Sequence, residues 1–160
     1  MSGRVEALWL KRAHRDPMDP ADTITLLAHR GVEDDVNFGR SKRQVTIIEK
    51  EVFDRIVASL PDVRPSMRRA NVMVTGVRLK ETQGHTLTLG SVRIHIHGKT
   101  RPCEQMDAQV AGLTAALDPD WNGGVYGVVL DDGEIRVGDE ASIAANSRPY
   151  SSASRTDTAT

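Results

Sequence analysis

Cysteine is almost absent from this sequence, which contains only one, Cys103. A lone thiol excludes an internal disulfide, and it excludes an iron–sulfur cluster held by four cysteines of one chain. The N-terminus also lacks the charged and apolar regions of a signal peptide. Both absences predict a protein of the reducing cytoplasm.

Aromatic residues and net charge are also low, with two each of Trp, Tyr and Phe and a formal charge of −1. Scarce aromatic side chains argue against a surface on which nucleic-acid bases stack. A balanced charge gives no attraction to a polyanion or a membrane surface. No apolar run reaches the length of a membrane span. We therefore expect neither nucleic acid nor membrane as a partner.

Short β-prone runs make up most of the remaining sequence. Strands are predicted at 5–11, 23–28, 44–48 and 71–75, an alternating strand at 91–97, and a hairpin with an Asp-Gly turn at 128–137. Apolar residues at helical spacing predict helices over 52–60 and 106–117, and residues 121–127 are typical of a loop. This pattern predicts a mostly β (α+β) domain over residues 1–144, an antiparallel β-barrel with two main helices. The Ser-, Arg- and Thr-rich residues 145–160 are expected to form a disordered tail.

Cys103 lies in the segment Gly98-Lys-Thr-Arg-Pro-Cys-Glu-Gln-Met106. Lys99 and Arg101 supply positive charge, and Pro102 suits the first turn of a helix. A thiol in such a position is biased toward thiolate, which attacks electrophiles and binds soft metals. The nearby acidic residues Glu104 and Asp107 favour the neutral thiol instead. The alternative is an inert cysteine buried in the core.

Four ordered segments of the chain together resemble a MOSC domain, the family named after the C-terminal domain of molybdenum-cofactor sulfurases. They are residues 31–37 with 43–47, residues 69–79, residues 87–94 running into Thr100-Arg-Pro-Cys103, and residues 124–139. The resemblance covers roughly residues 5–143, and the ordered set that includes Pro-Cys is more specific than any one segment.

The resemblance implies a β-barrel-like domain whose cysteine, here Cys103, ligates the molybdenum of a pterin cofactor or carries sulfur. It implies a molybdenum-cofactor-associated protein that reduces N-hydroxylated or N-oxygenated compounds, with electrons from a partner. The alternative is a non-catalytic sulfur-carrier or cofactor-binding module that works with a cysteine desulfurase. Pyridoxal phosphate would then belong to that partner, because this chain is too short to include the desulfurase domain.

A pterin cofactor carries a phosphate, which Arg, Lys and backbone N–H groups bind well. Cofactor-binding candidates in or beside the resembling segments are Arg43, Arg68, Arg69, Asn71, Lys99, Arg101, Asp35 and Asn37. Arg69 and Asn71 fit the family's Arg-x-Asn pattern. Asp35 keeps the carboxylate of the family's Gly-Asp-x-His pattern, but Asn37 stands where histidine is common, which argues against proton transfer there. The alternatives are solvated surface arginines and ordinary loop acids.

His95 and His97 form an i, i+2 pair on one face of the predicted strand at 91–97. With Cys103 six residues after His97, they suggest a zinc site as an independent alternative. We prefer the interpretation that the two histidines belong to an exposed polar strand face.

Overall fold

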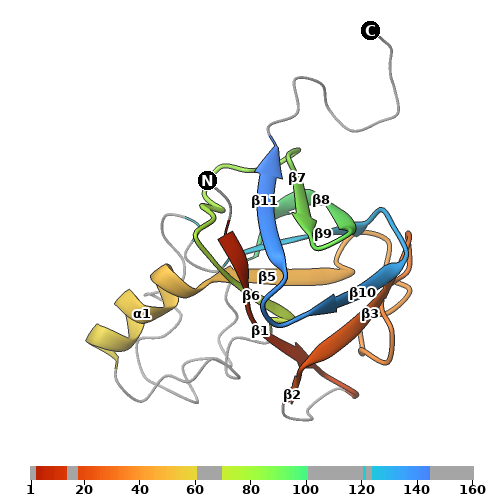
Figure 1. The fold of residues 1–160 in the computed structure, drawn as a ribbon, viewed down its shortest axis with the longest axis horizontal. Coiled ribbons are helices and arrows are strands. Elements are labelled where there is room, and N and C mark those ends of the chain that lie inside the picture. The colour runs from red at the N-terminus through yellow and green to blue at the C-terminus, as the bar shows by residue number, and fades with distance from the viewer. Residues whose placement is uncertain (1–2, 14–17, 61–69, 101–120, 122–123, 145–160) are drawn as a thin grey trace, which may run out of the picture.

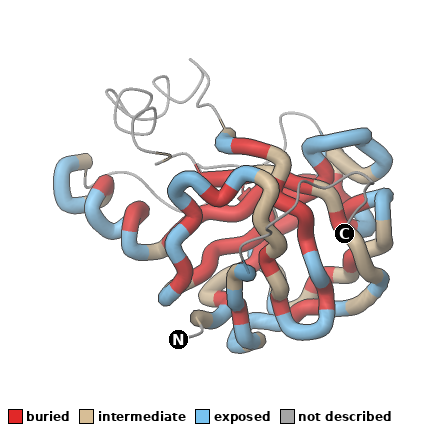
Figure 2. The backbone as a smooth tube through the Cα atoms, turned by 90° about the horizontal axis from the view of Figure 1, so that it is seen from above, coloured by how far each residue is buried: buried red, intermediate tan, exposed pale blue. Residues whose placement is uncertain are grey.

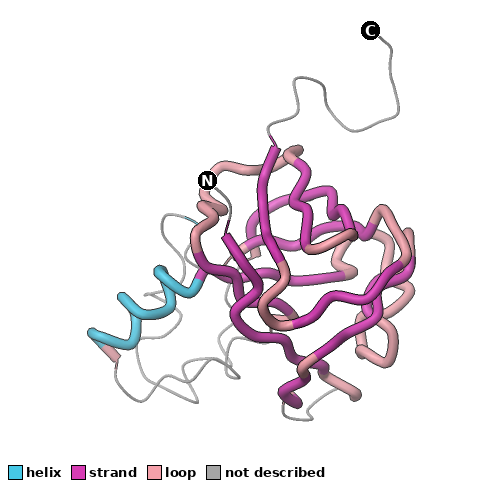
Figure 3. The backbone as a smooth tube through the Cα atoms, viewed as in Figure 1, coloured by secondary structure: helices cyan, strands magenta, loops and turns pink. Residues whose placement is uncertain are grey.

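The computed structural model describes residues 3–13, 18–60, 70–100, 121 and 124–144. The helix expected over 106–117, the tail expected from residue 145, and Cys103 lie outside these residues. In chain order the elements are β1 (Gly3–Leu10), β2 (Asp19–Ala21), β3 (Thr23–Leu27), β4 (Gly31–Val32), β5 (Val45–Glu49), α1 (Lys50–Ser59), β6 (Val72–Thr75), β7 (Thr86–Leu89), β8 (Val92–Lys99), β9 (Val125–Val129), β10 (Gly133–Arg136) and β11 (Glu140–Ala144) (Figure 3).

Seven strands close into a barrel in the order β11-β7-β8-β9-β5-β6-β1, and β1 pairs again with β11 (Figure 1). The closing pair joins Gly3 to Ala141. All barrel pairings are antiparallel except that of β5 with β6, which run parallel because α1 forms the crossover between them. The predicted mostly β barrel is therefore confirmed, with one parallel pair that the sequence pattern did not reveal.

The barrel interior is filled by alternating side chains of its strands. In β8 these are Val92, Ile94 and Ile96, each 0% exposed, which confirms the alternation predicted for this segment. Branched apolar residues from the neighbouring strands meet them, including Val125 and Ile47. Figure 2 shows this buried zone as a continuous centre of the molecule. The apolar face of every barrel strand is thus removed from water, the main source of folding free energy.

Helix α1 packs on the outside of the barrel and creates a second, smaller core (Figure 1). Its stripe of Val52, Phe53 and Ile56 is buried against Ile48 of β5 and Met73 of β6. The helical spacing predicted this stripe correctly. No helix among the described residues is long and apolar enough to cross a membrane.

The hairpin predicted at 128–137 is wrong. Strand β9 pairs with β5 and β8, whereas β10 pairs with β3 in a separate three-stranded sheet. The two acids of the turn explain the separation, because Asp131 binds a residue of β8 and Asp132 binds the residue that follows β3. Asp131 accepts a hydrogen bond from the backbone N–H of Arg93 at 3.0 Å, and Asp132 accepts one from the N–H of Ala28 at 2.7 Å. The chain therefore crosses from the barrel to the second sheet at the Asp-Gly turn.

The loop predicted at 121–127 is also wrong in its second half, because β9 begins at Val125. Gly124 has φ +85°, and a Cβ atom there would collide with the carbonyl oxygen of Ile47. Only glycine combines this left-handed conformation with such a close approach to β5. Gly124, one of the glycines that suggested a loop, instead allows two strands to come together.

Candidate functional site

Asp35 is one of the predicted site residues, and the structure buries it to 6% exposure. Its Oδ1 accepts hydrogen bonds from the backbone N–H of Lys11 at 2.8 Å and from Nδ2 of Asn71 at 3.1 Å. Its Oδ2 accepts from the backbone N–H of Asn37 at 3.1 Å. A buried carboxylate is tolerated when donors compensate its desolvation, and three N–H groups do so here.

Asn71 completes this buried polar cluster and is 3% exposed. Its Oδ1 accepts from the backbone N–H of Thr46 at 3.1 Å and from the Thr46 hydroxyl at 3.3 Å. Its Nδ2 donates to Asp35 and to the carbonyl of Trp9, the latter at 3.3 Å. One amide side chain therefore links β1, β5, the start of β6 and the loop after β4. Both its oxygen and its nitrogen are engaged within the protein, so this cluster positions the chain around it.

The predicted site residues do not all meet. Asp35, Asn71 and the backbone of Asn37 come together, while the Asn37 side chain is half-buried at the edge of the cluster. Arg43 precedes β5 and Lys99 ends β8, and both are exposed. Lys99 pairs with Val125 of β9, and Val125 pairs with Ile47 of β5, so Lys99 lies level with Ile47. Arg43 precedes the other end of β5, so Arg43 and Lys99 lie toward opposite ends of these paired strands. Arg68, Arg69, Arg101 and Cys103 lie outside the described residues.

A row of polar side chains crosses the outer face of β6, β5, β9 and β8. Asn71 hydrogen-bonds Thr46, Thr46 faces Tyr126 across the strands, and the Tyr126 ring lies 5.5 Å from that of His97. Their sequence neighbours Val72, Ile47, Val125 and Ile96 point into the barrel core, which places the row outside. Sequence reasoning missed Thr46, which lies inside the predicted strand at 44–48, and Tyr126. The alternation of 125–129 shows Tyr126 only when that segment is taken as a strand.

His95 lies beside this polar row but is 7% exposed, so its assignment to an exposed strand face is wrong. Burial lowers the pKa of His95, and the nearby charge of His97 lowers it further. This histidine is therefore mainly neutral near physiological pH. Among the described residues no three His, Cys, Asp or Glu side chains gather as metal ligands. The zinc alternative needs Cys103, which is outside them.

A cleft of about 490 Å³ opens beside the first turns of α1, against the segment that follows β6. Its charged residues in the described part of the chain were not predicted as site residues; they are Glu49, Glu51, Arg55, Arg78 and Lys80. One signal was the place of Glu49 directly after the predicted strand at 44–48. An extension of that strand by one residue puts this acidic side chain on the same face as the core residues Val45 and Ile47.

Comparison with known structures shows the same architecture elsewhere. YuaD from Bacillus subtilis superposes with a TM-score of 0.76 at 18% identity, covering 91% of this chain and 97% of that chain. YiiM from Escherichia coli gives 0.67 at 15% identity, covering 91% and 71%. YiiM from Geobacillus stearothermophilus gives 0.68 at 15% identity, covering 89% and 75%. At these identities the likeness concerns the fold alone.

Sequence comparison identifies the family. No curated protein matches the chain significantly. A family model for the MOSC domain matches residues 33–142, which is more than half of the chain and includes Asp35, Asn71 and Cys103. The closed barrel agrees with that match. The chain belongs to the MOSC domain family.

Proposed function

We propose that this protein binds the molybdenum cofactor and uses Cys103 as a ligand of molybdenum or as a carrier of sulfur. The observation that carries the proposal is the MOSC match over residues 33–142, within which Cys103 follows Pro102 and the end of β8. Thiolate is a soft ligand for a transition metal, and it can also hold a transferable sulfur as a persulfide.

The donor groups of the described residues fit a polar, phosphate-bearing cofactor. The outer polar row offers the phenol of Tyr126 and the imidazole of His97, and Lys99 adds an exposed cation at the end of β8. Hydroxyl, imidazole and ammonium groups donate hydrogen bonds to pterin oxygen and nitrogen atoms and to phosphate. When bound, the cofactor would supply the redox chemistry for reducing N-oxygenated compounds, with electrons from a partner protein.

Hydrogen bonds among the described residues hold the backbone next to two of the motif segments, the one that contains Arg69 and the one that contains Cys103. The Asp35–Asn71 cluster holds Asn71, which lies two positions after Arg69 in the sequence and directly before β6. The backbone N–H of Thr100 donates to the carbonyl of Gly124 at 2.9 Å, three positions before Cys103. A binding residue is positioned accurately when the backbone beside it is held by a rigid element. We infer that the Asp35–Asn71 cluster acts by this positioning and not by direct contact.

The proposal is tested by producing the protein in a host that makes molybdenum cofactor. Metal content and pterin fluorescence are measured for the wild type, for Cys103→Ala and for Ser142→Ala, an exposed control on β11. We expect molybdenum and pterin in the wild type and control, and their loss in Cys103→Ala. Reduction of N-hydroxylated substrates by the loaded protein with an artificial electron donor would establish the oxidoreductase role.

The carrier role gives a different result in the same preparation. Incubation with a pyridoxal-phosphate cysteine desulfurase and cysteine would add one sulfur atom to Cys103, detected by intact mass and absent in Cys103→Ala. Stoichiometric zinc that is lost in His95→Ala would contradict both roles. Identical metal, pterin and persulfide content in the wild type and Cys103→Ala would show that the thiol is inert.

A further inference from the structure

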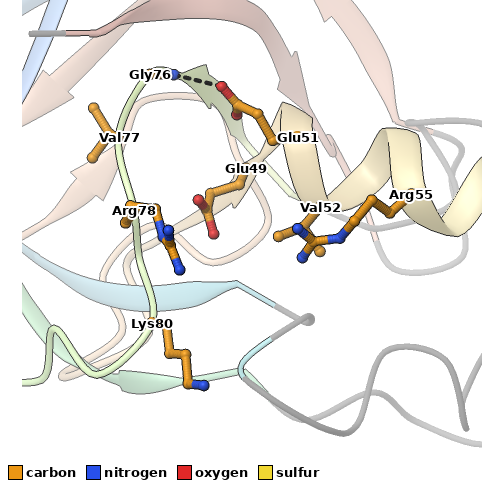
Figure 4. A pocket seen from close by; sticks show the side chains of 8 residues that line it. All are labelled: Glu49, Glu51, Val52, Arg55, Gly76, Val77, Arg78 and Lys80. Carbon is orange, nitrogen blue, oxygen red and sulfur yellow. Dashed lines mark hydrogen bonds between the residues drawn. The ribbon is translucent and has the colours of Figure 1, made fainter.

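The cleft beside α1 lies where β5 ends and α1 begins, and the segment after β6 closes its other side. Glu49, the last residue of β5, forms its floor, and Val52 and Arg55 line it from α1 (Figure 4). Val77, Arg78 and Lys80, from the segment after β6, form the opposite side. Its volume of about 490 Å³ is within the range of small-molecule sites. None of the described residues assigned to the molybdenum cofactor is among these lining residues.

The charges of the lining favour an anion. Three cations, Arg55, Arg78 and Lys80, face two carboxylates. One of these, Glu51, accepts a hydrogen bond from the Gly76 N–H at 2.8 Å (Figure 4). It also accepts one from the Thr75 hydroxyl at 2.7 Å. Its negative charge is therefore already compensated by local donors.

The two arginines have no hydrogen-bonded partner within the described part of the chain. Neither guanidinium donates a hydrogen bond there, and neither lies within ion-pair distance of a carboxylate. Their charges act on Glu49 only at longer range. A guanidinium carries a planar set of N–H donors that matches the oxygen atoms of phosphate or carboxylate. Two of them on opposite walls of one cleft form a clamp for a tetrahedral anion.

Glu49 adjusts the strength of this clamp. Burial raises the pKa of the Glu49 carboxyl, and the charge of Glu51 raises it further, whereas the Leu79 N–H, Arg78 and Arg55 act in the opposite direction. Lys80 also faces the cleft. When Glu49 is protonated the floor is neutral and its O–H can donate to an anion oxygen. When Glu49 is ionised it repels the anion.

We propose that this cleft binds a small phosphate-bearing anion, either inorganic phosphate or a phosphomonoester, between Arg55 and Arg78. The proposal goes beyond the proposed cofactor function, because its described lining shares no residue with the described residues assigned there. Val52 and Val77 supply apolar walls for the organic part of a phosphomonoester. A carboxylate ligand would engage one guanidinium, whereas a phosphate group has enough oxygen atoms to engage both.

The test is a titration of the full-length protein followed by amide NMR at constant ionic strength. Inorganic phosphate, glycerol phosphate and acetate are the probes. We expect both phosphate probes to shift the amides of Gly76 and Leu79, and acetate to bind more weakly. In the double variant Arg55→Gln/Arg78→Gln, we expect the affinity for phosphate to fall about tenfold or more. Arg136→Gln, the same type of substitution at an exposed position on β10, serves as the control and keeps wild-type affinity.

Sulfate is the probe for the pH dependence of binding, because its charge does not change in the pH range where proteins remain folded. Its affinity is expected to rise as pH falls through the raised pKa of Glu49, and Glu49→Gln is expected to bind tightly with a flat pH profile. Tighter binding of glycerol phosphate identifies a phosphomonoester ligand, and tighter binding of inorganic phosphate identifies the free ion. Equal affinities in the double variant and the Arg136→Gln control would overturn the proposal, as would shifts confined to amides away from the cleft.

Discussion

Asn71 and Asp35 show at the scale of single residues how polar groups connect distant parts of this chain. Thirty-six positions separate them in the sequence, and a hydrogen bond of 3.1 Å joins them inside the protein. The family resemblance selected both residues, Asp35 through the Gly-Asp-x-His pattern and Asn71 through the Arg-x-Asn pattern. Their mutual contact was not visible, since it depends on how β1, β5 and β6 pair.

Replacing Asn71 with alanine should destabilise the fold by about 2–4 kcal/mol. The substitution leaves the buried Thr46 N–H without its side-chain acceptor and removes one donor from Asp35. Urea denaturation of the wild type and variant measures the loss. Asn37→Ala is the control, because only the backbone of Asn37 bonds to Asp35, and it should change stability by less than about 0.5 kcal/mol. Equal losses in both variants would contradict the assigned role of the Asn71 side chain.

Glu49 should make the stability of the protein depend on pH. Its pKa is raised in the folded state, mainly by burial, so folding favours the protonated carboxyl. The wild type therefore loses stability as pH rises from the ordinary carboxyl range through the raised folded pKa. Glu49→Gln lacks this titration and should be more stable than the wild type at about pH 8, with the difference shrinking toward about pH 4. Urea denaturation across this pH range measures it, and a constant difference would show that Glu49 does not titrate there.

At the scale of elements, the sequence predicted the helix and strand features that depend on residues close together in the chain. The apolar stripe of α1 and the alternation in β8 are set by residues three, four or two positions apart, and both are confirmed. The hairpin at 128–137 has the same local signature as a true hairpin. The hairpin prediction is wrong because Asp131 and Asp132 form hydrogen bonds with residues far away in the sequence, Arg93 and Ala28. A local sequence pattern does not contain this information.

The close approach of β9 to β5 depends on Gly124. Gly124→Ala should cost more than about 3 kcal/mol, because strain at positive φ adds to the collision with the Ile47 carbonyl. Gly84→Ala is a matched control, since Gly84 has nearly the same φ, +84°, and nothing lies within 4 Å of an added Cβ atom. The control should cost about 1–2 kcal/mol. Thermal unfolding of both variants separates the two contributions, and similar shifts would show that β9 and β5 move apart freely.

The whole molecule is organised by closure of the barrel, which gives most strands a hydrogen-bonded neighbour on each side. Within the described ranges, strands β5, β8 and β9 have two partners each, whereas β2 pairs only with β1 and β4 only with β3. The closed order could be inferred from the sequence only through the family resemblance. The cleft beside α1 could not, because its side chains meet only after the crossover from β5 to β6 is complete.

Amide hydrogen exchange should reflect this organisation. We expect the amides of β5 and β9 to exchange only through global unfolding, and those of β2 and β4 to exchange through local opening, orders of magnitude faster. Exchange followed by NMR or mass spectrometry at neutral pH measures both groups. If β5 and β2 exchanged at similar rates, the barrel would not be a cooperative unit.

The pairing of β1 with β11 has a consequence for the order of events during synthesis. β1 contains residues 3–10 and β11 contains residues 140–144, so the last ladder of the barrel forms only after nearly the entire described chain has left the ribosome. Until then, one edge of β1 lacks its final neighbour. Contacts this distant in sequence slow folding, and an unpaired edge invites association between nascent chains. The protein should therefore refold slowly for its size, with a yield that falls as its concentration rises.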